Sequence, residues 1–303
     1  MLQPIITLFL TLPFDHSQQL FLVSLYNLVK FTSPAFIFGI VFTVIRKNDQ
    51  QAKLPLKSYF SDQWDNNFFP TFAWTLFYLI AMPNLQQHGH FHNIATFIWQ
   101  FFSDNATPHL WYSVMMLQFL LIMPGIKSVC NWVQHSYRRL LIAVISSGII
   151  YFAWLIFYDH FILNGPEATH WYLLDRIFIS FLIFGLYGGL SWNFHHEIQT
   201  FLFTYWWLIV GFHLLTYFRT RDLFLATFKL TDLTNDSYYL PSMAIYALAV
   251  ILLIYLICIA QKVFNMNYWL KSIHFLAFYA YRAFLANVFW DRIFWQYFNF
   301  ISQ

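Results

Sequence analysis

One stretch of the sequence combines side chains that could act on a hydroxyl group at a membrane surface. It reads His109-Leu-Trp-Tyr-Ser-Val-Met-Met-Leu-Gln-Phe-Leu-Leu-Ile-Met-Pro124 and opens an expected membrane span at residues 108–126. His109 could take a proton from a hydroxyl as a general base. Trp111 could stack on a sugar or an acyl group, and Gln118 adds an amide deeper in the same helix. The alternative is that His109 and Trp111 belong to the aromatic belt of the membrane interface.

Arg282 is the strongest candidate for a functional role among the charged residues of the expected spans. It stands near the middle of the span at residues 272–295, within Phe278-Tyr-Ala-Tyr-Arg-Ala-Phe-Leu285. A charge at the centre of a spanning helix costs about 2.5–3.5 kcal/mol, so we expect Arg282 to point into the bundle. There it would bind a carboxylate, a carbonyl or an anionic substrate group, or else form an ion pair that fixes helix packing. The other ionisable residues of the expected spans are Lys30, Asp175, Arg176, His213, His274, Asp291 and Arg292.

Two further sets of polar residues are expected to have structural roles. Asp175 and Arg176 are adjacent, and adjacent side chains do not face each other on an α-helix, so packing is the expected role. His88, His90 and His92 alternate along a loop and could converge on Zn²⁺ or Cu²⁺ if that loop were extended. No Cys or carboxylate accompanies them, so we interpret the run as a polar loop and predict no metal site.

The composition of the chain indicates that the protein lies in a membrane. Charged residues make up 10% of the 303 residues, against about 25% in soluble proteins. Hydrophobic residues reach 59% and aromatic residues 23%. Because 16 basic and 13 acidic side chains cannot cover a soluble protein of this size, the outer surface must face the lipid bilayer. The net charge of +3 is too small to indicate a nucleic-acid partner. We therefore expect a multi-pass protein of the cell membrane.

Eight stretches are long and apolar enough to cross a bilayer, which takes about 20 residues each. They lie at roughly 20–45, 68–84, 108–126, 140–159, 171–192, 200–218, 240–261 and 272–295. Residues 1–14 make a partial ninth span, and residues 93–102 suit an interfacial or re-entrant helix. Pro34 should kink the first full span. The prediction is an all-α polytopic transmembrane helical bundle, with eight full spans plus a partial N-terminal one, in a single domain over residues 1–303.

The basic residues of the loops orient this bundle. Nine of them alternate onto one side, which should be the cytoplasm: Arg46, Lys47, Lys53, Lys57, Lys127, Arg138, Arg139, Lys262 and Lys271. Arg219, Arg221 and Lys229 fall on the predicted outer face and are the exception. Two N-glycosylation patterns, beginning at Asn105 and Asn235, also fall on that face.

Five stretches of the chain resemble, in the same order, the motifs of the acyltransferase-3 family of integral-membrane acyltransferases. The segment from His109 to Pro124 resembles the family's His-Leu-Trp-Phe, Gln-Phe-Tyr and Pro pattern. The others are Asn27-Leu-Val-Lys-Phe-Thr-Ser-Pro-Ala-Phe-Ile-Phe-Gly39, Tyr59-Phe60 with Pro70-Thr-Phe-Ala-Trp-Thr-Leu-Phe-Tyr78, Phe184-Gly-Leu-Tyr-Gly-Gly189, and Leu276 to Leu285. The resemblance therefore covers nearly the whole chain.

The resemblance implies transfer of an acetyl or other short acyl group from acyl-CoA to a hydroxyl of an extracytoplasmic polysaccharide, glycolipid or cell-envelope glycan. Acyl-CoA would be a donor substrate, with no bound cofactor. His109 would be the hydroxyl-side catalytic group and Arg282 the anion-holding one, while Trp111 and Gln118 would bind substrate.

The chain departs from the family's pattern at charged positions. The Arg and following His of the family's first helix are absent, Asp62-Gln63 replaces a basic pair, and Arg282 replaces the His of the last helix. Two explanations compete: the true start lies upstream, or the chain is a divergent relative. A divergent relative could act as a glycan transporter or accessory subunit that performs no covalent step.

Overall fold

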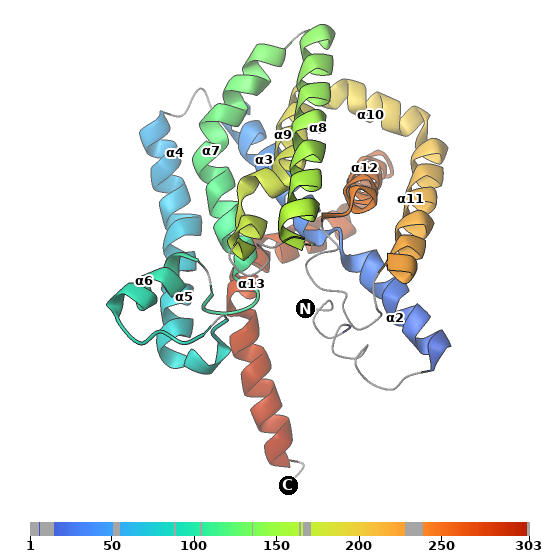
Figure 1. Cartoon of the computed structure of the whole chain (residues 1–303). Helices are drawn as coiled ribbons and strands as arrows, with labels where there is room; N and C mark the ends of the chain where they lie inside the picture. Colours follow the sequence, from blue (N-terminus) through green and yellow to red (C-terminus); the bar gives the residue numbers. More distant parts are fainter. Residues whose placement is uncertain are drawn as a thin grey trace. The chain divides into compact units, whose positions relative to one another are not determined.

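A computed structural model describes residues 6, 15–50, 55–87, 89–103, 105–134, 136–163, 165, 171–227 and 239–301. The secondary structure of these residues is entirely helical (Figure 1). The chain forms two compact units, one built from residues 1–50 and 122–263 and the other from residues 51–121 and 264–303. Each unit is described by itself. The expected all-α class is confirmed, while the single domain stays a prediction.

The first unit holds most of the long apolar helices. Its helices are α2 (His16–Val29), α3 (Thr32–Gln50), the second half of α7 (Trp111–Val133), α8 (Tyr137–Tyr158), α9 (Leu182–Asn193), α10 (His195–Thr204), α11 (Trp206–Thr227) and α12 (Pro241–Val263). A π-helical turn (Asp159–Leu163) follows α8, and two 3₁₀ segments (Tyr172–Arg176 and Phe178–Phe181) precede α9.

The second unit contains all four predicted site residues. Its helices are α4 (Leu56–Gln63), α5 (Phe69–Ala81), α6 (Ile94–Phe102), the first half of α7, and α13 (Asn267–Ile301). A π-helical segment (Trp64–Phe68) joins α4 to α5, and a 3₁₀ turn (Pro83–Leu85) follows α5. The expected short helix at residues 93–102 is confirmed as α6, whose N-cap Asn93 accepts a hydrogen bond from the backbone N–H of Thr96 at 2.8 Å.

The prediction of eight full spans is wrong. Among the described residues, four helices are long and apolar enough to cross a membrane: His16–Gln50 (α2 and α3 together), Trp111–Val133, Tyr137–Ile162 and Pro241–Val263. The pair α10 and α11 makes a fifth if it counts as one span, although it is bent by 83°. Only Ile6 of the partial span at 1–14 lies within the described residues. By length and composition these helices indicate a multi-pass membrane protein whose apolar helices contact the bilayer.

The expected spans at 68–84, 171–192 and 272–295 are not long apolar helices, for reasons of local sequence and structure. Helices α4 and α5 run on without a break through the π-helical segment at Trp64–Phe68, but the polar residues Asp62, Asp65, Asn66 and Asn67 keep this stretch outside the apolar class. The 3₁₀ segments leave α9 with 12 residues. At 1.5 Å per residue such a helix reaches about 20 Å, against a hydrocarbon core of about 30 Å. Helix α13 has 35 residues and is long enough, but its many Trp, Tyr and charged residues keep it outside the apolar class.

The first full span is interrupted just before Pro34. A turn at Lys30 and Phe31 separates α2 from α3, and Pro34 lies in the first turn of α3. Pro34 has no N–H to bond the Lys30 carbonyl four residues earlier. The interruption therefore lies where a proline disturbs a helix, as the sequence predicts.

Helices α3 and α9 form the closest packing of the first unit. Gly188 lies against the backbone of α3: a Cβ on it would overlap the Phe38 carbonyl oxygen and lie 3.2 Å from the Phe38 Cα. A Cβ on Gly189 would lie 2.8 Å from the Cys130 Sγ. Small residues let membrane helices approach until their backbones touch. The Gly-rich stretch of α9 therefore sets how closely these helices pack.

Candidate functional site

His109 lies immediately before α7 and is enclosed by the second unit. Its Nε2 lies 3.4 Å from the Leu285 carbonyl oxygen on α13, and its Nδ1 lies 3.0 Å from the Thr107 Oγ1. The ring also meets Tyr78 and Phe284 edge-on, with centroid distances of 5.5 and 5.3 Å. His109 is therefore contacted by residues from three segments and is half-buried.

These contacts assign the tautomer of the imidazole. A carbonyl oxygen can only accept, so Nε2 carries the hydrogen and donates it to Leu285. In the neutral ring Nδ1 is then the acceptor, and the Thr107 hydroxyl donates to it. The lone pair that would act as a base therefore already faces a hydroxyl group.

Tyr78 of α5 explains how the Leu285 carbonyl is positioned. The Tyr78 hydroxyl donates to the Leu285 carbonyl oxygen at 2.8 Å and accepts from the Phe289 backbone N–H at 3.2 Å. This carbonyl and this N–H are the i, i+4 pair that an α-helix ordinarily bonds directly. Tyr78 therefore ties α5 to α13 at the residue that His109 contacts. Tyr78, Leu285 and Leu110 belong to one fully buried cluster.

Burial governs the charge of His109. Desolvation lowers the pKa of His109 from 6.5 to about 4, although its hydrogen bond to the Leu285 carbonyl acts in the opposite direction. The imidazole is thus neutral at pH 7 and can accept a proton. Its low pKa also makes it a weaker base than an imidazole that titrates near neutrality.

Acidification is expected to destabilise the protein through His109. The unfolded chain binds this proton below about pH 6.5 and the folded chain only near pH 4, so stability is present above pH 6.5 and falls as the pH drops between these values. The full difference of pKa amounts to about 3 kcal/mol. Melting temperatures of the wild type and His109→Gln, measured from pH 7 to pH 4.5, test this. The variant should lose less stability on acidification than the wild type, and equal losses would contradict the assignment.

The three other predicted site residues lie apart from the His109 contacts. Trp111 is the first residue of α7 and is half-buried, with its ring 6.2 Å from that of Tyr112. Gln118 is also half-buried and lies on the same face of α7, because residues i and i+7 align on an α-helix. Trp111 and Gln118 could therefore contact one extended ligand.

Arg282 does not lie in the interior of the second unit, contrary to expectation. Its side chain is exposed, and its guanidinium carbon lies 6.0 Å from the Phe278 ring centroid. Within the described part of the chain no ion pair involves it. Since Tyr281 and Leu285 of the same helix face inward, Arg282 occupies a different side of α13. Its role as an anion-holding group stays a prediction.

Sequence reasoning missed Thr107, Tyr78 and Phe284, which complete the surroundings of His109. Thr107 was noticed only as part of the pattern at Asn105, and the structure buries both of these residues. The folded chain therefore does not present Asn105 for glycosylation, and the pattern at Asn235 lies outside the described residues. Proximity of Thr107 to His109 in sequence is the one available signal, since Tyr78 lies 31 residues before His109 and Phe284 lies 175 residues after it.

The Asp175–Arg176 pair also differs from the expectation. The Arg176 Nε lies 3.5 Å from the Asp175 Oδ1, and both side chains are largely buried. They end a 3₁₀ segment rather than standing in an α-helix, so the rule for adjacent helical positions does not apply. Nearby in the same unit, Tyr158 and Tyr239 stack at 3.8 Å. This packing at the start of α9 agrees with a structural role.

A buried polar seam joins α2, α11 and α12 in the first unit. Lys30 donates to the Tyr26 hydroxyl at 2.6 Å, and Asn27 donates to the Tyr217 carbonyl at 3.0 Å. Tyr217 in turn contacts the ring of Tyr246, at 6.1 Å. Among the residues that the structure describes, neither the buried Asn27 Oδ1 nor the buried Tyr246 hydroxyl has a hydrogen-bond partner. Burying such groups is costly, which marks the seam as a polar feature within apolar helices.

The histidine run lies only partly within the described residues. His90 and His92 are described and His92 is exposed, while His88 lies outside the described residues. Among the residues that the structure does describe, no three His, Cys, Asp or Glu side chains gather to hold a metal ion.

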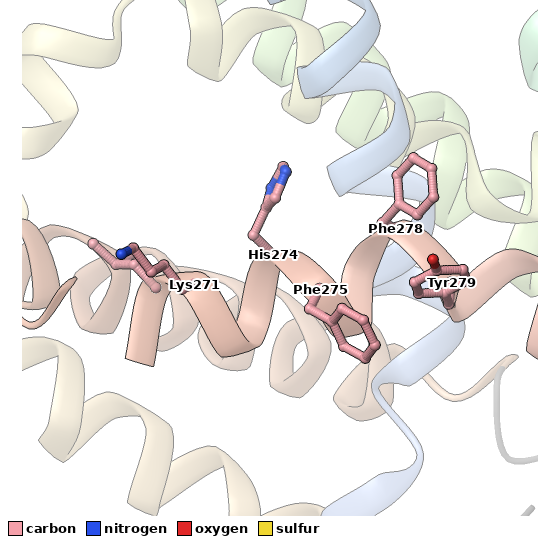
Figure 2. Close-up of a pocket in the computed structure, with 6 residues that line it drawn as sticks. Lys271, His274, Phe275, Phe278 and Tyr279 are labelled. Carbon is pink, nitrogen blue, oxygen red and sulfur yellow. The ribbon is translucent and has the colours of Figure 1, made fainter. Parts of the chain in front are cut away.

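A shallow, open groove of the second unit runs along α13. It has a volume of about 790 Å³ and is lined by Leu270, Lys271, His274, Phe275, Phe278 and Tyr279 (Figure 2). Lys271 and His274 lie toward the start of the helix, and the aromatic side chains follow them. This groove was not expected from the sequence, although His274 had been noted as an ionisable residue.

The chain was compared with protein-family models, with curated proteins and with solved structures, and none of the three comparisons found a match.

Proposed function

We propose that the chain is a membrane O-acyltransferase. It would move an acetyl or other short acyl group from acyl-CoA to a hydroxyl of an extracytoplasmic polysaccharide or cell-envelope glycan. The motif order that resembles the acyltransferase-3 family supports this proposal. The observation that carries it is the neutral His109, whose Nδ1 faces the hydroxyl of Thr107 at 3.0 Å.

In the proposed reaction His109 deprotonates the acceptor. The acceptor hydroxyl takes the place of Thr107 at Nδ1, or passes its proton to Nδ1 through the Thr107 hydroxyl. The acceptor oxygen forms a bond to the acyl carbon, the thioester C–S bond breaks, and the proton leaves with the CoA thiolate. Arg282 holds the donor's phosphates, and Trp111 and Gln118 bind the glycan.

A second candidate function is that of a glycan transporter or accessory subunit that performs no acyl transfer. Two observations favour it. Both ring nitrogens of His109 already have protein partners, and Arg282 lies on another side of α13. In this case His109 would stabilise the junction of α5 and α13, and the bundle would only bind the glycan.

A labelled-donor assay separates the two candidates. Purified full-length protein in lipid nanodiscs is given acetyl-CoA labelled in the acetyl group, together with a cell-envelope polysaccharide. The enzyme should leave label on the glycan as an ester that mild alkali releases. Glycan binding without label would reject the enzyme and support the accessory function, and neither label nor binding would reject both.

A further inference from the structure

The first half of α13 presents positive charge at one end of an exposed aromatic surface. Lys271 and His274 lie one turn apart, so their side chains are neighbours on the helix. Both line the groove of about 790 Å³, and both side chains are exposed. An anionic group is the natural partner for this end of the groove.

The rest of the groove is aromatic. Phe275 and Phe278 are 63% and 64% exposed, and each ring lies 5.0 Å from that of Tyr279. His274 and Phe278 project from the same side of the helix (Figure 2). A small anion would leave these rings uncovered, whereas an acyl chain would cover them. The groove therefore suits a molecule with an anionic head and an apolar tail.

The sequence around the groove contains no acidic residue that could pair with Lys271 in place of a ligand. Residues 264–290 contain no Asp or Glu, so nothing in this stretch neutralises Lys271. Tyr268 and Trp269 precede the groove and are 82% and 59% exposed. Such amphipathic rings favour the level of the lipid headgroups, which is where a lipid phosphate lies.

We propose that this groove binds an anionic phospholipid, with the headgroup phosphate at Lys271 and His274 and an acyl chain along Phe275, Phe278 and Tyr279. A zwitterionic lipid carries its own cation beside the phosphate and gains less from these side chains. The lipid site uses neither His109 nor Arg282, although the Arg282 guanidinium carbon lies 6.0 Å from the Phe278 ring centroid at its far end.

Photo-crosslinking in defined membranes tests the site. The full chain is reconstituted in phosphatidylcholine vesicles with a trace of phosphatidylglycerol or phosphatidylcholine carrying a photoreactive acyl chain, and crosslinked peptides are identified by mass spectrometry. Phosphatidylglycerol should label residues 270–279 about fivefold more than phosphatidylcholine, the preference expected for one basic side chain near a membrane surface. Equal labelling by the two lipids, or labelling only elsewhere, would overturn the proposal.

Matched variants locate the effect. Lys271→Gln with His274→Gln should reduce the phosphatidylglycerol signal to the level of phosphatidylcholine. Arg138→Gln with Arg139→Gln removes two exposed basic groups elsewhere and should leave the preference unchanged. If both double variants lose the preference equally, only general surface charge is at work and the site is rejected. Acetyl-CoA is added as a competitor: displacement of the lipid would assign the groove to the acyl donor instead, and persistence of labelling supports the lipid.

Discussion

Gly188→Ala is expected to destabilise the protein by about 3 kcal/mol, at the upper end of overpacking costs. The added methyl group would overlap the carbonyl oxygen of Phe38 and lie 3.1 Å from its carbonyl carbon. Backbone atoms cannot rotate away as a side chain can, so α3 and α9 would have to separate. Separation would open the buried contacts that surround Gly188, since α9 is buried on almost every side.

Gly39→Ala is the matched control for this effect. Gly39 lies in α3, directly after Phe38, and a Cβ at this position meets nothing within 4 Å. Here Ala should stabilise the helix by up to about 1 kcal/mol, because it has the higher helix propensity. Thermal melting in detergent should show Gly188→Ala several degrees below the wild type and Gly39→Ala at or above it. Equal melting temperatures for the two variants would show that α3 and α9 do not pack this closely.

His109→Gln is expected to lower the rate of acyl transfer by a factor of about 10²–10⁴, the usual contribution of a general base. Glutamine can still donate to the Leu285 carbonyl and accept from Thr107, so the junction should persist while the base is lost. The measurement is the initial rate of ester formation under saturating donor. Glycan binding should remain, because the variant changes proton transfer rather than the binding surface.

A second histidine provides the control for this variant. His160 is exposed in the π-helical turn after α8, and His160→Gln should leave the rate unchanged. If His109→Gln retains full activity while folding normally, His109 is not the catalytic base. If the wild type has no activity but binds glycan, the accessory function remains, and His109→Gln should then change only the pH dependence of stability.

Composition and hydrophobic pattern determined the class of this protein. A chain with 10% charged residues cannot cover itself against water, which leaves an all-α membrane protein as the expected structure. Local composition also identified α6 and the long helices α7, α8 and α12. These features depend on neighbours in sequence, so the sequence is enough to predict them.

The number of spans needed the tertiary structure. Hydropathy treats residues 171–192 as one continuous helix, but 3₁₀ segments take up its first part and shorten α9. The alternative hydrogen bonds in these segments carry no hydropathy signal. The bend of 83° between α10 and α11 also leaves no sign in the hydropathy pattern, because the sequence is apolar before and after the bend.

The candidate site also depends partly on local sequence and partly on tertiary structure. The sequence identified His109 as a group with useful chemistry and a place at the start of a helix. Only the folded chain brings Tyr78 and Leu285 to it, from positions far along the sequence. Those contacts decide which nitrogen carries the hydrogen and how strongly burial lowers the pKa. Residue type sets what a side chain can do, while its tertiary partners set its charge, its tautomer and the side of the helix it occupies, as Arg282 also shows.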